Sequence, residues 1–266
     1  MTQAAQLVFL GARGSIPISG RDYVKYGGNT TCLAICEDDE MVGVIDAGTG
    51  LVRLDDHGLD VPTSLAILLT HYHWDHIQGL SMLPELWNGG HMFTFIGAGD
   101  IEAMLTGAIR PPWFPIALRE SECALAYRNV DERMRLGDVA VGSFPVNHPQ
   151  GAVGFRLDGP RGSIALVTDH ESTSESDDII APQIEGVDVL IHDAQYLPVE
   201  LARRHGWGHS TWEQAVVMAE RIGATRLILT SHSPRRTDPE IDAIVSEARA
   251  RFPDTEAARE GLRVDF

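Results

Sequence analysis

The chain of 266 residues carries a formal net charge of −17, with 44% hydrophobic and 22% charged residues. Its length fits one large domain or two small ones, and its composition is ordinary for a globular protein with a buried core. Each phosphate contact with a nucleic acid needs a Lys or Arg, so the acidic charge argues against binding of long nucleic acids. No apolar run approaches the roughly 20 residues that a membrane-spanning helix needs, so no membrane partner is expected.

The three cysteines are expected to be free thiols. Cys32 and Cys36 fall in one predicted strand, where four residues of rise separate them by about 13 Å. That separation exceeds the reach of a disulfide, and Cys123 stands alone. Free thiols, together with an N-terminus that has no basic segment or signal-type apolar core, predict a cytoplasmic protein.

The first predicted strands end in loops that leave alternatives open. Strand Leu7–Leu10 runs into a glycine-rich loop at Gly11, and a second such loop surrounds Gly27. Either loop could approach a ligand closely or be an ordinary turn. The strand Met41–Ile45 ends at Asp46, which is either a turn residue or a hydrogen-bond acceptor for a metal-bound histidine.

Three histidines and a carboxylate are crowded into one HYHWDH motif, directly after the apolar run Leu65–Leu69, a predicted buried strand. His71 and His73 are two residues apart, so in an extended chain their imidazoles point to the same side. Asp75 and His76 follow, where the chain can present both toward the same point. Imidazole and carboxylate suit zinc, manganese or iron, and four such groups can hold more than one ion.

The segment after this motif carries helical spacing and then a proline-rich interruption. Helices are predicted at Ile77–Trp87 and at Asp100–Ile109. The segment Pro111–Pro115 excludes regular structure and displays two large aromatic side chains. It is either a lid or wall of a substrate pocket or a packed surface connection, and the packed connection is favoured.

In the second half, each predicted strand is followed by a residue that can bind a metal or carry a proton. The pairs are Val139–Val146 with His148, Ser163–Val167 with Asp169, Val187–Ile191 with Asp193, and Arg226–Leu229 with His232. Sites in layered α/β proteins are built where strands end. Helices are predicted at Thr211–Ile222 and Pro239–Arg251, and the tail after Pro253 is expected to be frayed. The pattern predicts a single domain over residues 1–266, with strands sandwiched by helices.

The order and type of these residues resembles the metallo-β-lactamase-fold hydrolases over nearly the whole chain. The resemblance implies an α/β fold, specifically a four-layer αββα sandwich, and a dinuclear metal site. It assigns one ion to His71, His73 and His148, and the other to Asp75, His76 and His232, with Asp169 bridging both. The two divalent ions are expected to be zinc, with manganese or iron as alternatives.

Two further stretches resemble the phosphodiesterase branch of that superfamily, which includes ribonuclease Z. The HDAQY stretch at 192–196 stands where that branch has His-Glu-Ala-Thr, and GHST at 208–211 looks like its Gly-His-Ser-Thr motif. Asp193 departs from the branch's Glu. Ribonuclease Z also carries a tRNA-clamping arm where only some twenty residues separate His148 from Asp169 here. The short segment in place of that arm, together with the acidic charge, argues against tRNA as substrate.

His209 is expected to be a general acid. Ser210 and Glu213 fit a capping box, which predicts a helix beginning at Thr211 directly behind it. The amide groups of a helix start favour an anion such as a phosphate oxygen. A carboxylate such as Asp193 would keep the imidazole protonated. The alternative is a surface histidine that precedes a helix.

The expected reaction is hydrolysis of a small phosphodiester, such as a cyclic nucleotide or short oligonucleotide, by a hydroxide that bridges two metals. His209 would protonate the leaving group, and Asp75 would hold its metal and orient the nucleophile. A thioesterase or lactonase using the same metals on a carbonyl carbon is the alternative. A non-enzymatic metal sensor would be indicated by a missing ligand, and none is missing. Monomer and homodimer both remain open.

Overall fold

The computed structural model describes residues 5–130 and 133–266, so residues 1–4 and 131–132 of the predicted domain lie outside the described residues. Within the described residues the strands form two sheets of seven. The first sheet, in spatial order, contains β14 (Arg263–Asp265), β1 (Ala5–Gly11), β2 (Cys32–Glu37), β3 (Glu40–Ile45), β4 (Ser64–Leu68), β5 (Met92–Gly97) and β6 (Ala124–Asn129). The second contains β13 (Thr255–Ala257), β12 (Arg226–Thr230), β11 (Val189–Asp193), β10 (Ser163–Val167), β9 (Ala152–Asp158), β8 (Val139–Val146) and β7 (Arg133–Leu136).

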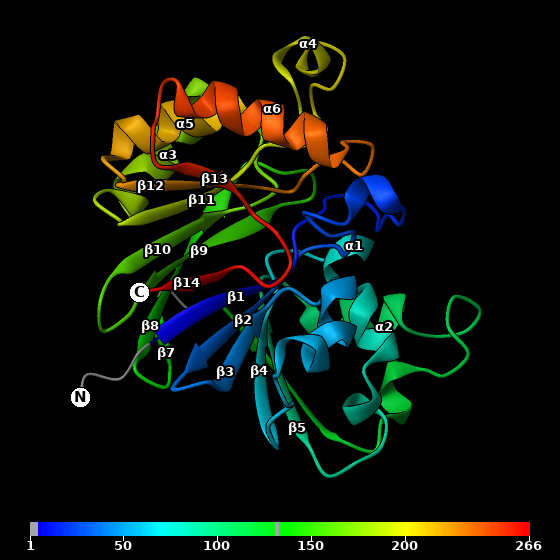
Figure 1. The fold of residues 1–266 in the computed structure, drawn as a ribbon. Helices are drawn as coiled ribbons and strands as arrows, with labels where there is room; N and C mark the ends of the chain where they lie inside the picture. Colours follow the sequence, from blue (N-terminus) through cyan, green and yellow to red (C-terminus); the bar gives the residue numbers. More distant parts are fainter. Residues whose placement is uncertain (1–4, 131–132) are drawn as a thin grey trace.

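Helices cover the outer face of each sheet (Figure 1). The helices are α1 (Trp74–Ile77), α2 (Ile101–Ala108), α3 (Ser174–Ile184), α4 (Pro198–Leu201), α5 (Trp212–Ile222) and α6 (Asp238–Arg249), of which α4 stands on a projecting loop and covers neither sheet. The α3, α5 and α6 helices lie on the second sheet, while α1 and α2 lie on the side of the first. This arrangement confirms the predicted four-layer αββα sandwich. None of the helices in the described residues is long and apolar enough to cross a membrane.

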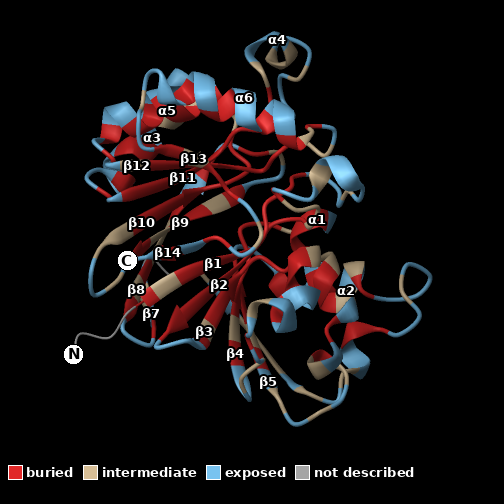
Figure 2. Cartoon of the chain, in the orientation of Figure 1, coloured by how far each residue is buried: buried red, intermediate tan, exposed pale blue. Residues whose placement is uncertain are grey.

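The buried side chains form layers between these elements, as the red strands and inner helix faces of Figure 2 show. Alternate residues of a strand point to opposite faces of its sheet. Leu7 and Phe9 of β1 therefore pack between the two sheets, whereas Val8 and Leu10 pack toward the helices of the first sheet. A third apolar cluster joins the second sheet to α3 and α5. Both sheets are thus held rigidly from both faces, which fixes the positions of their strand ends.

The predicted helix Ile77–Trp87 is wrong over most of its length. After α1 the chain continues as two 3₁₀ segments, Gln78–Met82 and Pro84–Leu86. Gly79 donates its amide hydrogen to the carbonyl of Ala47 at 2.8 Å, away from the helical pattern. Pro84 has no amide hydrogen to donate. Apolar spacing alone did not reveal these two breaks.

The tail after Pro253 is ordered, contrary to the prediction that it is frayed. β13 pairs with β12 in the second sheet, and β14 pairs antiparallel with β1 in the first. Val264 and Phe266 are buried between the sheets, Phe266 with 2% of its surface exposed. Inward-facing apolar residues therefore anchor a segment whose composition is otherwise polar. The three cysteines are free, as predicted.

Candidate metal centre

The predicted ligands lie where strands of both sheets end. The HYHWDH motif follows β4, His148 follows β8, Asp169 follows β10 and His232 follows β12. Two of the turns at these strand ends, and the one after β3, hold a non-glycine residue in the left-handed region: Asp46 at φ 58°, Asp169 at φ 51° and Ser231 at φ 55°. Such conformations are uncommon and cluster at functional sites. They turn the chain sharply, so that side chains from several strands reach one point.

Three imidazole nitrogens converge at the centre of the site. Nδ1 of His73 lies 3.0 Å from Nε2 of His71 and 3.1 Å from Nε2 of His148. Their hydrogen-bond roles follow from the partners of the other ring nitrogens. The hydroxyl of Thr70 donates to Oδ2 of Asp46 at 2.9 Å, so its oxygen accepts from Nδ1–H of His71 at 3.0 Å.

The other two histidines also donate away from the centre. Nε2–H of His73 donates to Oε1 of Gln150 at 3.0 Å, and Nδ1–H of His148 donates to the carbonyl of Gly208 at 2.8 Å. Burial lowers the pKa of His148, and it lowers the pKa of His71 well below its usual range. In a neutral imidazole the nitrogen that does not donate carries a lone pair.

Nε2 of His71 and Nε2 of His148 therefore carry lone pairs that point at Nδ1 of His73, an arrangement that a cation between them would stabilise. Neutral imidazole is also the form that binds zinc, at about 2.0–2.1 Å. These residues fit a divalent metal.

A carboxylate lies directly beside this cluster. Oδ2 of Asp169 is 3.3 Å from Nε2 of His76, 3.8 Å from Nε2 of His71 and 4.0 Å from Nε2 of His148. Oδ1 of the same residue accepts from the hydroxyls of Thr168 at 2.8 Å and Ser231 at 3.2 Å. The second oxygen is thus left to face the histidines of both predicted subsites. Burial alone would raise the pKa of Asp169, but the charges of His76 and His209 hold it well below its usual range.

His76 faces carboxylates with both ring nitrogens. Nδ1 lies 2.8 Å from Oδ2 of Asp46, and Nε2 lies 3.3 Å from Oδ2 of Asp75. Nε2 makes no well-aligned hydrogen bond within the part of the chain that the structure describes. Two alternatives were predicted for Asp46, a turn residue or a hydrogen-bond acceptor for a histidine of the site. The structure shows both, because Asp46 lies in the turn after β3 and accepts from His76, a predicted ligand. Burial would lower the pKa of His76, but Asp169 and Asp75 raise it well above its usual range.

His232 lies apart from these groups. Among the described residues, the sets of potential ligand atoms that lie within 4.8 Å of one another include His71, His73, His76, His148 and Asp169, but neither Asp75 nor His232. Asp75 still lies 3.3 Å from His76, whereas no hydrogen bond or ion pair joins His232 to another predicted ligand in the described chain. Its Nε2–H donates to the carbonyl of Ala258 at 2.9 Å. Burial, with the nearby charge of Arg13, lowers the pKa of His232 to about 3, so the ring is neutral. Nδ1 is the nitrogen left to carry a lone pair.

A buried His–Asp pair adjoins the centre. Nδ1 of His209 lies 2.6 Å from Oδ2 of Asp193, whose other oxygen accepts from the amides of Gln195 and Ser210 at 3.1 and 3.0 Å. Burial would lower the pKa of His209, but Asp193 and then Asp169 raise it to about 9. The three groups Asp169, Asp193 and His209 lie within 4.8 Å of one another. His209 is therefore a buried, protonated imidazole beside the predicted ligands, and it is not a surface histidine.

The predicted capping box is displaced by one residue. The N-cap of α5 is Thr211, whose side chain accepts from the amide of Gln214, and Gln214 returns a bond to the amide of Thr211. Ser210 does not serve as the cap, because its amide donates to Asp193 and its hydroxyl accepts from the amide of Ser172 at 3.2 Å while donating to the carbonyl of His170. The residue is used to hold the His–Asp pair in place.

The first glycine-rich loop reaches the site, and the second packs against the first. The amide of Ser15 donates to Oδ2 of Asp75 at 2.7 Å, and the carbonyl of Gly27 accepts from the fully buried guanidinium of Arg13 at 2.8 Å. Sequence reasoning assigned no role to these residues, nor to Thr70, Gln150 and Gly208. The glycine content of the loops was the one local signal, because the contacts themselves depend on tertiary placement.

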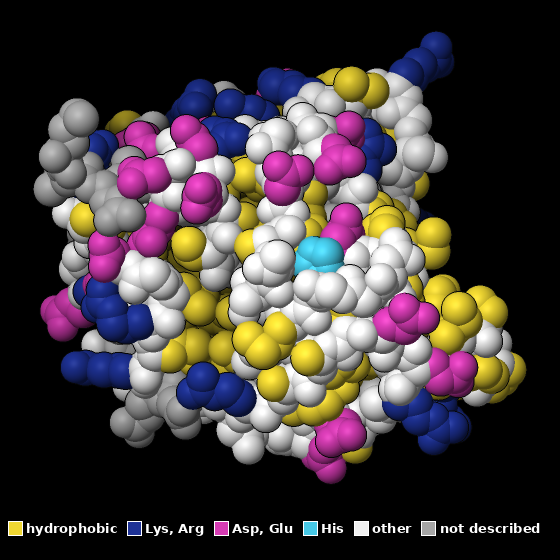
Figure 3. All heavy atoms as spheres, turned by 90° about the horizontal axis from the view of Figure 1, so that it is seen from below, with side chains coloured by type: hydrophobic (Ala, Val, Ile, Leu, Met, Phe, Trp, Pro, Cys, Tyr) yellow, Lys and Arg dark blue, Asp and Glu magenta, His cyan; other side chains and the backbone are white. Residues whose placement is uncertain are grey.

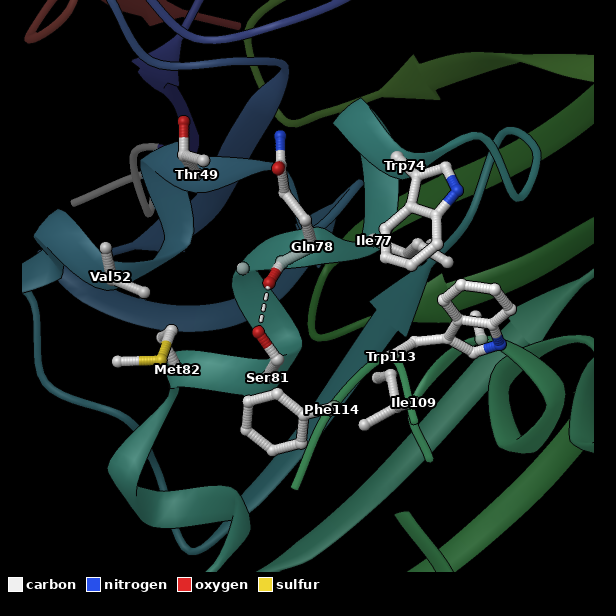
Figure 4. A pocket seen from close by; sticks show the side chains of 12 residues that line it. Thr49, Val52, Trp74, Ile77, Gln78, Ser81, Met82, Ile109, Trp113 and Phe114 are labelled. Atoms are coloured by element: carbon white, nitrogen blue, oxygen red, sulfur yellow. Dashed lines mark hydrogen bonds between the residues drawn. The ribbon is translucent and has the colours of Figure 1, made fainter. Parts of the chain in front are cut away.

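The segment 111–115 contributes to an apolar pocket of about 290 Å³ close to the centre (Figure 4). Phe114 stacks on Trp87 with 5.6 Å between ring centroids, as a packed connection would. Trp113, in contrast, is 66% exposed and lines the pocket together with Trp74 of α1. The segment is thus both a packed connection and a pocket wall.

Comparison with known proteins identifies the family. The beta-lactamase superfamily domain matches residues 44–232, more than half of the chain. The chain belongs to the beta-lactamase superfamily. Ribonuclease BN of Cronobacter sakazakii is 23% identical over 316 residues, covering 97% of this chain and 99% of the relative. Ribonuclease Z of Salinibacter ruber is 27% identical over 312 residues, covering 97% and 93%.

A solved structure agrees with the family. The crystal structure of a diphosphatase from the PhnP family superposes with a TM-score of 0.72 at 22% identity, covering 98% of each chain. At that identity the likeness establishes the fold alone. Membership of this superfamily confirms the resemblance drawn from the HYHWDH motif and the prediction of a metal-dependent hydrolase.

Proposed function

We propose that this superfamily member is a phosphodiesterase that uses two divalent ions, zinc by preference, on a small or flexible phosphodiester. The observation that carries the proposal is the His209–Asp193 pair, 2.6 Å apart and beside Asp169. Cleavage of a phosphodiester with an alkyl or ribose leaving group needs a proton donor, and a carboxylate-supported imidazole supplies one. Relatives named ribonuclease Z and ribonuclease BN support the same reaction class.

The predicted ligand sets remain as assigned from the sequence. One subsite consists of His71, His73 and His148. Asp75, His76 and His232 would hold the other ion, His232 through Nδ1, and Asp169 would serve both. Divalent ions held there would acidify water to supply hydroxide and would neutralise charge on the phosphoryl oxygens.

The protein's own side chains supply orientation and proton delivery. Asp193 holds Nδ1–H of His209, so the remaining Nε2–H is the proton that reaches the leaving oxygen. The amides of Gln195 and Ser210 fix Asp193 in turn. Asp75 is oriented by the amide of Ser15, and we assign it a second role in orienting the nucleophile.

Two features favour a small substrate: the short segment between His148 and Asp169 and the mixed charges of the surface. Nearly all of the residues between His148 and Asp169 form β9, β10 and their short connection, so that stretch carries no arm for folded RNA. The alignments with the ribonucleases extend over 316 and 312 positions, more than this chain's 266, so those relatives carry additional segments. On the face in Figure 3, Lys and Arg are interspersed with Asp and Glu, and no continuous basic patch is visible.

The deciding experiment compares His209→Ala with the wild type on two phosphodiesters that differ in the leaving group. An alkyl or ribose leaving group needs the proton, so its rate should fall by about 10²–10⁴-fold. An activated aryl leaving group departs without protonation and should be affected little. Metal content, measured by elemental analysis, should stay near two ions per chain. Equal losses on both substrates, or faster hydrolysis of a thioester or lactone than of any phosphodiester, would contradict the proposal.

The pH profile of Asp193→Asn tests the same proton. A general acid works in its protonated form, below its pKa, and the raised pKa of His209, about 9, extends activity on an alkyl diester toward alkaline pH. Asp193 makes the largest contribution that raises this pKa. The substitution should therefore move the alkaline limb of kcat to lower pH, while the profile on the aryl diester keeps its shape. An unmoved limb would remove Asp193 from the mechanism.

A further inference from the structure

The proposed hydrolysis mechanism uses none of the side chains that line the apolar pocket beside the metal centre. The walls of this pocket come from the 3₁₀ segment Thr49–His57, α1, the 3₁₀ segment Gln78–Met82, the end of α2 and the segment 109–114 (Figure 4). Its large apolar side chains are Val52, Trp74, Ile77, Met82, Ile109, Trp113 and Phe114. Trp113 is 66%, Met82 65% and Trp74 58% exposed, so much of this apolar surface faces solvent.

The pocket and the metal centre share one short helix. Trp74 stands in the chain between His73 and Asp75, and it lines the pocket while Asp75 and His76 are buried toward the other ligands. α1 therefore presents Trp74 to the pocket and its next two residues to the predicted metal site. A substituent on a phosphodiester held at those ligands would enter the pocket along the exposed ring of Trp74.

The lining selects an uncharged group. No Asp, Glu, Lys, Arg or His lines this pocket in the described chain. Each of its polar side chains has a hydrogen-bond partner in the protein. Ser81 donates to the carbonyl of Gln78 at 2.8 Å, Nε2 of Gln78 donates to Oγ1 of Thr30 at 3.3 Å, and Oγ1 of Thr49 accepts from the amide of Thr30 at 2.9 Å. A volume of about 290 Å³ is close to the lower end of ligand pockets, roughly 300 Å³, and well above the roughly 150 Å³ of an apolar cavity that admits benzene.

We propose that this pocket binds an uncharged aromatic substituent of the substrate, with Trp113 as its principal contact. This inference rests on the proposed phosphodiesterase function. It narrows the substrate class to phosphodiesters that carry one large, neutral, ring-containing group. Aromatic side chains contribute large contact area and a geometric preference for other rings, which suits such a group.

A pair of substrates with one leaving group isolates the pocket. Both are p-nitrophenyl phosphodiesters, one with methyl and one with naphthylmethyl as the retained group. The wild type should prefer the naphthylmethyl ester by at least about tenfold in kcat/KM, mainly through KM. Trp113→Ala should abolish most of this preference, mainly by raising KM for the naphthylmethyl ester.

Two methionines provide a matched control. Met82→Ala, inside the pocket, should reduce the preference, whereas Met104→Ala, on the exposed side of α2 and outside the pocket, should not. Trp74 is left intact because it lies between two predicted ligands. Equal preference in wild type and Trp113→Ala would overturn the proposal, as would a preference for the methyl ester.

A binding measurement separates this inference from the proposed function. The neutral probe N-phenyl-1-naphthylamine, followed by its fluorescence, should bind the wild type and Met104→Ala, and bind Trp113→Ala at least about tenfold more weakly. Binding that depends on Trp113 in a protein that hydrolyses no phosphodiester would support the pocket and contradict the proposed function. Binding that is equal in all three proteins would overturn the pocket even if the phosphodiesters are hydrolysed.

Discussion

The two predicted metal subsites are supported by different means. At the first, the outward nitrogens of His71, His73 and His148 all donate to neutral acceptors, namely a hydroxyl, an amide and a backbone carbonyl. At the second, His76 lies between the carboxylates of Asp46 and Asp75. The histidines of the first subsite are therefore positioned by hydrogen bonds to neutral groups, and His76 of the second by neighbouring negative charges. A substitution that displaces a hydrogen-bond partner should affect mainly the first subsite, and one that removes a charge should affect mainly the second.

The largest effect is expected at Asp169, the group that faces both subsites. Asp169→Asn retains the size of the side chain and removes the charge. Both ions should be lost, and kcat/KM should fall by more than the roughly 10–100-fold that loss of a supporting hydrogen bond costs. Elemental analysis of protein purified without chelator checks this expectation. Retention of two ions would show that the subsites are independent.

Gly208→Ala should disrupt the first subsite alone. Gly208 has φ 81°, and an added Cβ would overlap Nδ1 of His148. Gly206, at φ 79°, has no atom within 4 Å of such a Cβ, so Gly206→Ala carries the same backbone strain without the overlap. We expect a loss of metal affinity toward about 100-fold for Gly208→Ala and little change for Gly206→Ala. Metal titration by calorimetry measures both, and equal losses would assign the effect to strain.

Asp46→Asn should weaken the second subsite more than the first. The amide keeps the shape of the carboxylate and removes the charge that lies 2.8 Å from His76. It touches the first subsite only through the hydroxyl of Thr70, which donates to Asp46 and accepts from His71. One of two ions should bind about tenfold more weakly, within the range known for groups that support a metal ligand. The other ion should be weakened less, as measured in the same titration. Equal weakening of both ions would mean that charge and shape do not distinguish the subsites.

The sequence carried most of the information on the predicted ligands because these residues are local to strand ends. His71, His73, Asp75 and His76 form one motif, and the apolar run before them places it after a strand. The spacing of apolar strands also placed His148 and Asp169 at strand ends without any structure. The same pattern predicted strands sandwiched by helices, and the family resemblance supplied the αββα layering.

The supporting contacts could not be found in this way. Thr70, Gln150 and Ser15 are ordinary residues whose roles come from partners up to 77 positions away, as with Gln150 and His73. The helix prediction over Ile77–Trp87 was wrong because apolar spacing does not show that the amide of Gly79 donates to the carbonyl of Ala47, in a different turn. The capping box was displaced because the amide of Ser210 is committed to a distant carboxylate.

The C-terminal segment has a consequence for how the protein folds. Gln6 pairs with Asp265 across almost the entire chain, and β14 thereby closes the edge of the first sheet. Contacts of such sequence separation must overcome the entropy of closing a very long loop, which slows folding. Until β14 docks, β1 is an open strand edge that can pair with other chains. Aggregation during refolding should therefore compete with this last closure, and it should rise with protein concentration.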